Sequence, residues 1–519
     1  MHRYRRALSI YLLLCFSFAA AFAQQPKPAT APAPKTLPEL QAKISEILAK
    51  PELSPAMVGI KVVSLDTGRV LFEDHADKLL RPASNMKLYT VAAALDRLTP
   101  DYRFVTSVYA STKPDAAGVV HGNLTIYGRG DPSIAARFNN GDYVKGIDDL
   151  AARIVAAGVK RVEGDLVGDE SYFVGPKLGS GWNWEDLTWY YGAEVTPLTV
   201  NDNALDLFIK PGPGVGQPAL ITTGPSDPLL KIVNNVTTSA KGARRELSIQ
   251  RGLGENVITI SGTIPLEDRG YTGGIGISHP ALLFVYMLRA SLAQKGVVIT
   301  GTSRTGATVG EYQNEIATLQ SPPFSVVALQ TLKPSQNLYT ELILRTLGKV
   351  SPPPVTTTTP STLPQTSEEL GLEAVKTFLK TVGIRPEALV LDDGSGLSRN
   401  DMITADASVQ LLTFMSKHRY ATVFRDALPI AGVDGTLRNR FKATPAENNL
   451  RAKTGSLSSA ASLGGYMTTA GGEKLAFSIM VNNYPHDFDP RSACIDPIAV
   501  LLASFAGKSS EASNAPTVH

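Results

Sequence analysis

The amino-acid sequence predicts an α/β protein in which a β-rich region interrupts a domain of helices and antiparallel strands. Its 519 residues exceed one typical domain of roughly 100 to 200 residues, and 43% hydrophobic with 19% charged residues is a globular composition. Short strands with glycine turns fill 101–280, whereas longer helices lie on either side. We therefore expect one discontinuous domain, 37–100 plus 281–506, and an inserted region at 101–280 that holds either one domain or, as we prefer, two nested domains.

The N-terminus has the pattern of a secretory signal peptide over residues 1–23. Three arginines precede a charge-free apolar run, which ends in Ala21-Phe22-Ala23 with small residues at the two cleavage-determining positions. We expect an exported, periplasmic protein. The alternative is an uncleaved anchor helix, because about 17 apolar residues are the lower limit for spanning a bilayer. Once the signal is removed, no segment of the sequence is expected to be integral to a membrane.

The two ends of the mature chain are expected to be flexible. Residues 24–36 are rich in proline and alanine, and residues 507–519 are polar without an amphipathic pattern. Cys494 is the only cysteine left after signal cleavage, so an internal disulfide is excluded.

Charge and motifs exclude several function classes. Loss of the signal arginines leaves 47 basic and 47 acidic residues, which disfavours a nucleic-acid partner. The seven histidines are scattered singly, so no metal site is predicted. A Walker loop, a GxGxxG turn and a GxSxG elbow are all missing from the sequence, and no cofactor is expected.

Hydrophobic periodicity predicts the elements in order. Before the β-rich region we expect helices at 37–48 and 84–98, with a hairpin formed by 56–65 and 69–72 between them. Inside the region we expect a mixed or mostly antiparallel sheet and one amphipathic helix near 147–157. After it we expect three helices and a final strand pair, at 281–295, 336–347, 368–382, 462–468 and 474–481.

The clearest chemical signal is Ser84-Asn85-Met86-Lys87, just after Pro82 at a predicted helix start. Ser84 and Lys87 are three residues apart and so share one helix face. A serine hydroxyl is a weak nucleophile until a base takes its proton, and a lysine held neutral by burial can be that base. On its own the pattern is also typical of an N-cap serine beside a solvated lysine.

Two further clusters follow in the chain. Ser335-Gln336-Asn337 opens a predicted helix, and Lys453-Thr454-Gly455-Ser456 precedes the final strand pair. Ser398-Arg399-Asn400 is a competing Ser-x-Asn match. We prefer Ser335, because a helix start directs its hydroxyl and the Asn337 amide together into a cleft. Each cluster alone is compatible with an N-cap or a turn, but the ordered set favours catalysis.

With these motifs the sequence resembles the low-molecular-mass penicillin-binding proteins of the D-alanyl-D-alanine carboxypeptidase/endopeptidase type. The interval of 251 residues between Ser84 and Ser335 is diagnostic, because this family inserts domains there. The resemblance covers about 37–505 and implies a serine β-lactamase/transpeptidase-like fold, an antiparallel sheet flanked by helices. It implies that the protein acts on peptidoglycan peptides and that β-lactams are its covalent inhibitors.

The resemblance also implies roles for individual residues. Ser84 would attack the carbonyl of the penultimate D-alanine, Lys87 would take its proton, and Ser335 would relay a proton to the leaving amine. Asn337 would bind the peptide amide, and Lys453 would add positive charge. Thr454, Gly455 and Ser456 would form the strand that holds the terminal carboxylate and one oxyanion donor.

A side pocket for the free end of diaminopimelate is implied by the same resemblance. Arg399 and Asp186 would supply its cation and anion. The remaining lining residues would be Tyr191, Ser395, Leu397, Leu457 and Ser458. The alternative is that Asp186 and Arg399 form a salt bridge holding the inserted and catalytic regions together.

Two other functions remain in competition with a peptidase. A β-lactamase would need a fast deacylating base, and the sequence lacks the Glu-x-x-Leu-Asn stretch that supplies one in class A enzymes. A non-catalytic β-lactam-binding or cell-wall-binding protein would be expected to lose one of the motif residues. The sequence does not apportion carboxypeptidase and endopeptidase activity, because both use one acyl-enzyme, and it does not define an oligomeric state.

Overall fold

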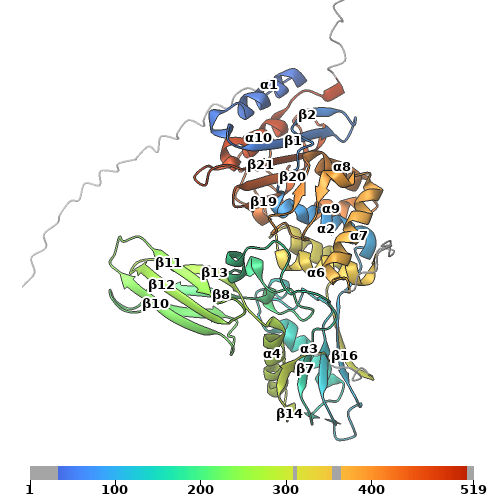
Figure 1. Ribbon diagram of the computed structural model, residues 1–519, viewed down its shortest axis with the longest axis vertical. Coiled ribbons are helices and arrows are strands. Elements are labelled where there is room, and N and C mark those ends of the chain that lie inside the picture. Colours follow the sequence, from blue (N-terminus) through green and yellow to red (C-terminus); the bar gives the residue numbers. More distant parts are fainter. Residues whose placement is uncertain (1–32, 308–312, 353–363, 511–519) are drawn as a thin grey trace, which may run out of the picture. The chain divides into compact units, whose positions relative to one another are not determined.

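A computed structural model describes residues 33–307, 313–352 and 364–510 (Figure 1). In it, one five-stranded sheet combines strands from the N-terminal and C-terminal parts of the chain. Its order is β19-β20-β21-β1-β2, and every neighbouring pair is antiparallel. The predicted N-terminal hairpin thus joins the predicted C-terminal strand pair. The strands are β1 (Met57–Ser64), β2 (Val70–Asp74), β19 (Arg451–Leu457), β20 (Ala460–Thr468) and β21 (Lys474–Asn482).

Helices cover both faces of this sheet because its strands alternate between two cores. In β21, Phe477 and Ile479 belong to one apolar cluster, whereas Ala476 and Met480 belong to the other. The first cluster contains α1 (Leu37–Leu48) and α10 (Asp496–Ser504). The second contains α2 (Met86–Leu98), α5 (Phe324–Leu332), α6 (Asn337–Val350), α7 (Ser367–Val382), α8 (Ala405–Lys417) and α9 (Ala421–Asp426).

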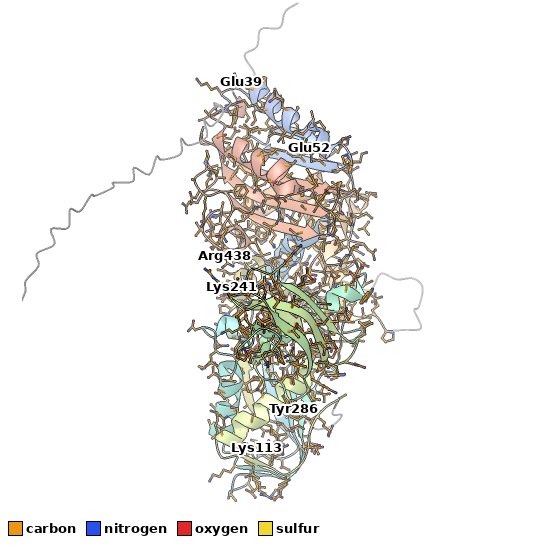
Figure 2. All side chains as sticks on the ribbon, turned by 90° about the vertical axis from the view of Figure 1, so that its left-hand side faces the viewer. Glu39, Glu52, Lys113, Lys241, Tyr286 and Arg438 are labelled. Carbon is orange, nitrogen blue, oxygen red and sulfur yellow. The ribbon has the colours of Figure 1, made fainter. Side chains whose placement is uncertain are left out.

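Capping boxes fix the starts of two of these helices. Thr36 begins α1 and Thr366 begins α7, each accepting from the backbone N–H of a glutamate three residues on. On α1 the partner is Glu39, which is exposed (Figure 2), while Leu40 and Ile44 are fully buried. The local sequence therefore sets both where the helix begins and which side it buries.

The β-rich region consists of four small sheets around a separate core, and two of these sheets are mixed. One sheet has the order β15-β7-β5-β3-β16 and another β14-β6-β4, with parallel and antiparallel pairs in the first. The strands are β3 (Val105–Ala110), β4 (Val119–Val120), β5 (Leu124–Tyr127), β6 (Arg161–Val162), β7 (Leu166–Asp169), β14 (Val298–Ile299), β15 (Ser303–Thr305) and β16 (Asn314–Gln320). Two helices, α3 (Lys145–Ala156) and α4 (Pro280–Gln294), pack on each other in this core.

Two three-stranded sheets complete the region. Their orders are β13-β8-β9 and β10-β12-β11, and β10 pairs with β12 in parallel. The strands are β8 (Ala204–Lys210), β9 (Leu220–Gly224), β10 (Lys231–Ser239), β11 (Glu246–Arg251), β12 (Val257–Pro265) and β13 (Tyr271–Gly276). A short pair, β17 (Leu389–Val390) with β18 (Met402–Ile403), lies elsewhere in the chain, among the C-terminal helices.

The expected boundary at 281 differs from the structure. Leu283, Phe284 and Leu288 of α4 are fully buried in the core of the β-rich region. Moreover, β16 pairs with β3, and β15 pairs with β7. The inserted region therefore runs to about residue 320, and the second part of the helical domain begins with α5.

Parts of the segments expected to be flexible, 24–36 and 507–519, are packed against the helical domain. Ser509 is fully buried, where its backbone N–H donates to Glu473 at 2.9 Å. At the other end, the carbonyl of Pro34 accepts from Ala506. The signal peptide expected at 1–23, the leader up to 32 and the tail from 511 lie outside the described residues. Within the described ranges, no helix is long and apolar enough to cross a membrane.

Candidate active site

Ser84 lies in a single 3₁₀ turn, Ala83–Asn85, directly before α2. Ala83 has a positive φ of 47°, a conformation that is rare outside glycine, and Asn85 donates to the Pro82 carbonyl to close the turn. The buried Asn85 side chain also donates to the Lys453 carbonyl at 3.2 Å. A strained turn that is fixed on both sides thus presents the Ser84 hydroxyl.

Lys87 is fully buried, and three oxygen atoms surround its amine. Its Nζ lies 2.9 Å from Ser84 Oγ, 2.6 Å from Asn337 Oδ1 and 2.7 Å from the Ser395 carbonyl oxygen. Burial lowers the pKa of Lys87 to about 7, partly offset by the negative charge of Asp393. A neutral amine is therefore accessible at neutral pH.

This arrangement suits a neutral amine as a base. A neutral amine has two N–H bonds and one lone pair. Asn337 Oδ1 and the Ser395 carbonyl can each accept one N–H, so the lone pair faces the remaining neighbour, Ser84 Oγ. The geometry therefore directs the proton-accepting site of Lys87 at the Ser84 hydroxyl.

Lys453 forms a second buried pair, with Ser335. Its Nζ donates to Ser335 Oγ and to the Thr454 carbonyl, both at 2.8 Å. Burial holds the pKa of Lys453 well below its usual value, and nearby Lys87 lowers it further. Ser335 has a φ of 65° and precedes α6, which begins at Asn337 with Gln336 as N-cap. The observed helix thus begins two residues after Ser335 and one residue after the predicted start at 336.

The Lys453-Thr454-Gly455 segment precedes the predicted strand pair, as expected, and itself forms part of β19, which pairs with β20. A Cβ at Gly455 would lie 2.1 Å from Ser462 Oγ and 2.4 Å from the Pro82 carbonyl. Only glycine therefore lets β19 approach the turn that carries Ser84. Thr454 Oγ1 donates to Thr436 Oγ1 at 2.8 Å.

The competing Ser-x-Asn match, Ser398-Arg399-Asn400, binds Asp392 and not Lys87. Ser398 Oγ donates to Asp392, and Asn400 Nδ2 donates to the same carboxylate at 3.2 Å. Neither residue contacts Lys87, whereas Asn337 does. The structure therefore brings the Ser335–Asn337 match, and not the Ser398–Asn400 match, to Ser84.

Asp393 organises the loop beneath Lys87. Its carboxylate accepts from the backbone N–H groups of Ser395, Gly396, Leu397 and Ser398. It also accepts from Trp182 Nε1 of the inserted region at 2.8 Å. The loop is thereby held with the Ser395 carbonyl toward Lys87.

A cavity of about 440 Å³ opens over Ser84. Ser335, Asn337, Thr454 and Ser456 line it, while the two lysines and Gly455 lie beneath its surface. Its other lining residues are Asp186, Tyr190, Tyr191, Pro334, Gly396, Leu397, Arg399, Thr436, Leu457 and Ser458. Most of the predicted side-pocket residues are therefore present.

Ser395 differs from its predicted place as a lining residue. It is fully buried, and its hydroxyl donates to Asp393 at 3.1 Å. Its contribution to the site is the backbone carbonyl that accepts from Lys87. A main-chain role of this kind depends on the fold of the loop rather than on the side chain.

Asp186 and Arg399 form an ion pair with each other at the cavity wall. Asp186 lies in a short 3₁₀ helix, Trp184–Thr188, that begins after Asn183. Its carboxylate accepts a hydrogen bond of 3.2 Å from the backbone N–H of Asn183. The pair joins the inserted region to the loop after Asp393, as the salt-bridge alternative expects. Because both residues also line the cavity, a ligand can reach them.

Sequence reasoning missed several residues of this site. Tyr190, Pro334, Gly396 and Thr436 line the cavity but are not among the residues that the motifs indicate. Gly396 has a φ of 77°, and a Cβ there would lie 1.9 Å from the Ala83 carbonyl. The glycine-rich DGSG sequence was the available signal for this close approach. Within the described part of the chain, His, Cys, Asp and Glu side chains form no group of three able to hold a metal ion.

A serine and two buried lysines, placed between a helix start and the edge strand of an antiparallel sheet, define a serine enzyme of the penicillin-recognising type. Comparison with known proteins agrees: the D-Ala-D-Ala carboxypeptidase 3 (S13) family matches residues 40–505. The chain belongs to this family. The resemblance seen in the motifs is therefore confirmed.

Individual relatives cover most of the chain. The D-alanyl-D-alanine carboxypeptidase of Actinomadura sp. (strain R39) is 34% identical over 484 residues, which cover 91% of this chain and 86% of that protein. The D-alanyl-D-alanine carboxypeptidase DacB of Haemophilus influenzae is 25% identical over 432 residues, 82% of this chain and 85% of that protein.

Solved structures confirm the predicted fold class. The crystal structure of penicillin binding protein 4 from Haemophilus influenzae matches with a TM-score of 0.74 at 22% identity. The match covers 88% of this chain and 97% of that one. A structure of the same protein complexed with a β-lactam matches with a TM-score of 0.68 at 21% identity.

Proposed function

We propose that this protein is an exported serine peptidase of peptidoglycan, which releases terminal D-alanine and also cleaves D-alanyl-diaminopimelate crosslinks. The observation that carries the proposal is the position of the buried Lys87 Nζ, 2.9 Å from Ser84 Oγ and in contact with two oxygens that accept hydrogen bonds from it. Family membership and the names of the relatives, D-alanyl-D-alanine carboxypeptidases, support the first activity.

Acylation would begin with attack of Ser84 Oγ on the carbonyl carbon of the penultimate D-alanine. Lys87 Nζ takes the hydroxyl proton as the new C–O bond forms. The backbone N–H groups of Ser84 and Ser456 stabilise the negative oxygen of the tetrahedral intermediate. Such donors are worth about 10² to 10³ in rate each.

Collapse of the intermediate breaks the C–N bond, and Ser335 Oγ delivers a proton to the leaving amine. Lys453, 2.8 Å from Ser335, is placed to replace that proton. Because burial lowers the pKa of Lys453, its ammonium form needs an anionic partner. The terminal carboxylate of a bound peptide, held by Thr454, supplies this partner. Water then hydrolyses the ester and regenerates Ser84.

Both activities use this same acyl-enzyme and differ only in the amine that leaves. In the carboxypeptidase reaction the amine is D-alanine, and in the endopeptidase reaction it belongs to the diaminopimelate of a second strand. A free diaminopimelate end carries a carboxylate and an ammonium group. Arg399 and Asp186 would exchange their mutual ion pair for one contact each with these groups.

The catalytic test is mass spectrometry of monomeric and crosslinked diaminopimelate muropeptides after incubation with the mature protein. Wild type is expected to release D-alanine or to split the dimer, and penicillin is expected to add its mass at Ser84. Ser84→Ala should do neither, whereas the matched control Ser54→Ala, at an exposed position, should behave as wild type. Export is tested by N-terminal sequencing of the secreted protein, which should begin after Ala23.

Two rivals predict other results. A β-lactamase would release hydrolysed penicillin with fast turnover, whereas a peptidase remains acylated. A non-catalytic binding protein would be labelled at Ser84 but leave both muropeptides intact. Either result would overturn the peptidase proposal.

A further inference from the structure

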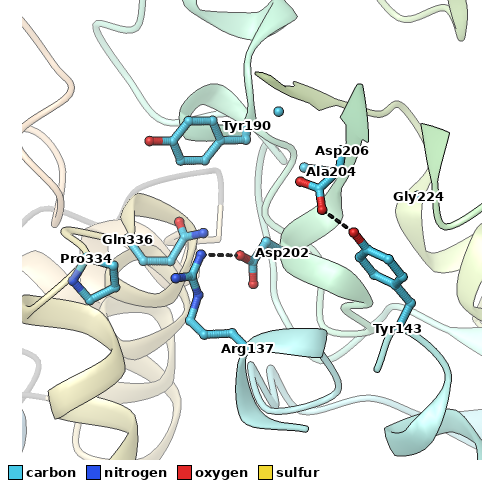
Figure 3. A pocket seen from close by; sticks show the side chains of 10 residues that line it. Arg137, Tyr143, Tyr190, Asp202, Ala204, Asp206, Gly224, Pro334 and Gln336 are labelled. Carbon is cyan, nitrogen blue, oxygen red and sulfur yellow. Dashed lines mark hydrogen bonds and ion pairs between the residues drawn. The ribbon is translucent and has the colours of Figure 1, made fainter. Parts of the chain in front are cut away.

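A second cavity of about 280 Å³ adjoins the reaction cavity (Figure 3). Tyr190 and Pro334 line both cavities. Gln336 and Arg137 lie on one side of the second cavity, and Asp206 and its partner Tyr143 lie on the other. Ser335 and Asn337, which line the reaction cavity, flank Gln336 in sequence, so the segment 334–337 borders both cavities.

Two glycines keep the second cavity open. A Cβ at Gly224 would lie 3.0 Å from the Tyr143 ring, and a Cβ at Gly274 would lie 3.1 Å from the Tyr190 side chain. Larger residues would push these rings into the space between them. The two tyrosine side chains thus contact strands at positions that lack a side chain.

A strained segment forms the floor of the cavity. Asn201, Asp202 and Asn203 all have positive φ values, 47°, 61° and 50°. The Asn201 and Asn203 side chains hold this backbone through hydrogen bonds to Ala136 and Val200. Consecutive left-handed residues cost free energy, and such strain is concentrated at functional sites.

The strained segment positions Asp202 between two elements. One oxygen accepts from Arg137 at 2.9 Å, and the other accepts from the buried Tyr339 hydroxyl of α6. Asp202 therefore neutralises the charge of Arg137, which also lines the cavity. It also links the cavity floor to the helix that carries Asn337.

Gln336 offers an unused donor at this cavity. Its side chain is only 2% exposed, and its Oε1 caps α6 by accepting from Leu338 at 3.0 Å. Its Nε2 has no hydrogen-bond partner. A buried amide N–H without a partner costs about 1 to 3 kcal/mol. Gln336 Nε2 and Arg137 together present donors to a carbonyl or carboxylate oxygen.

Asp206 supplies an unbalanced negative charge on the other side. The Tyr143 hydroxyl donates to it, but no cation of the described chain lies within ion-pair distance of Asp206. Since Arg137 is paired with Asp202, the lining carries a net charge of −1. Its chemical complement is an ammonium group accompanied by a hydrogen-bond acceptor.

We propose that this cavity is a second substrate subsite, which binds the free α-ammonium group of a peptide at Asp206 and the adjacent carbonyl at Gln336 and Arg137. The inference rests on the proposed peptidase function. It assigns Asp206 as a specificity-determining residue for amine-bearing stem peptides, apart from the pair at Asp186 and Arg399.

The experiment uses four synthetic stem pentapeptides ending in D-alanyl-D-alanine. They differ only by acetylation of the N-terminal amine, of the side-chain amine, of both or of neither. Values of kcat/KM are measured for wild type, Asp206→Asn, Asp186→Asn and the control Glu185→Gln. Glu185 is exposed and lines neither cavity, so its variant reproduces the charge change alone.

Wild type should prefer the free N-terminal amine by about tenfold, the value of one charged hydrogen bond. Asp206→Asn should remove this preference, which Asp186→Asn and Glu185→Gln should retain. Thermal unfolding and penicillin labelling of Ser84 check that each variant is folded. If Asp206→Asn shows the same preferences for both amines as wild type, the subsite is overturned. If wild type cleaves none of the peptides, the proposed function itself fails.

Discussion

The surroundings of Lys87 and Lys453 differ although both lysines are fully buried in one site. Lys87 lies between two carbonyl-type oxygens and Ser84, above a loop organised by Asp393. The Lys453 amine donates to Ser335 Oγ and to the Thr454 carbonyl, and the charge that affects its pKa is that of Lys87. Two equally buried lysines thus have different proposed roles: Lys87 acts as the base, and Lys453 needs the anion of the substrate to hold its proton.

Replacing each lysine by glutamine tests this difference most strongly. Lys87→Gln removes the base and should lower the rate of penicillin acylation by about 10³ to 10⁴, near the upper range for general base catalysis. Lys453→Gln should cost about 10², and more of its loss should appear in KM for peptides that end in a carboxylate. Acylation rates and peptide kinetics measure both effects. Exposed Lys78→Gln is the control; equal losses at both lysines would contradict the distinction.

A substitution that moves β19, which carries Lys453, away from the turn before Lys87 should cause the next largest loss of activity. In Gly455→Ala the added Cβ would lie 2.4 Å from the Pro82 carbonyl, which forces β19 away from the Ser84 turn. We expect acylation to fall about 100-fold and the free energy of unfolding to fall by about 1 to 3 kcal/mol. Urea denaturation and penicillin labelling measure the two losses. Gly214→Ala, with no atom closer than 3.9 Å, should change neither.

The pH dependence of acylation should follow Lys87. Its folded pKa of about 7 means that the amine is protonated below this pH and has no lone pair. Acylation by penicillin should therefore rise with pH through about 7 and be about 30-fold slower at pH 5.5 than on the plateau. Stopped-flow acylation rates give the profile. A rate independent of pH between 5.5 and 8 would exclude Lys87 as the base.

A smaller but more specific effect is expected from Asp393→Asn. The negative charge of Asp393 raises the pKa of Lys87, so its removal should move the acid limb to lower pH. The plateau rate should also fall about tenfold, because an amide accepts fewer of the loop N–H groups. The neighbouring Asp392→Asn, which pairs with Ser398 and Asn400, should leave the limb in place. A loss of rate without a shifted limb would indicate a structural role only.

The sequence predicts the side chains of this site better than it predicts the loop that holds them in position. Ser84, Asn337 and Lys453 are recognisable because each has a fixed local setting, at a helix start or in a strand. Asp393 and Ser395 act through backbone groups of a folded loop, so residue identity alone does not reveal them. The boundary at 281 was wrong because α4 is apolar on most sides, and such a helix does not indicate which core it joins.

The bond from Trp182 to Asp393 also limits how the protein can be shortened or recombined. The inserted region contributes the indole N–H below the loop and the Tyr191 carbonyl that accepts from Asn337 at 2.9 Å. Both contacts bear on Lys87, one through Ser395 and one through Asn337. A chain that retained only the helical domain would keep every motif residue. It would lose the two hydrogen bonds that hold Asp393 and Asn337 in place beside Lys87. In this protein the reactive serine and lysine are local in sequence, but their alignment is a property of the whole chain.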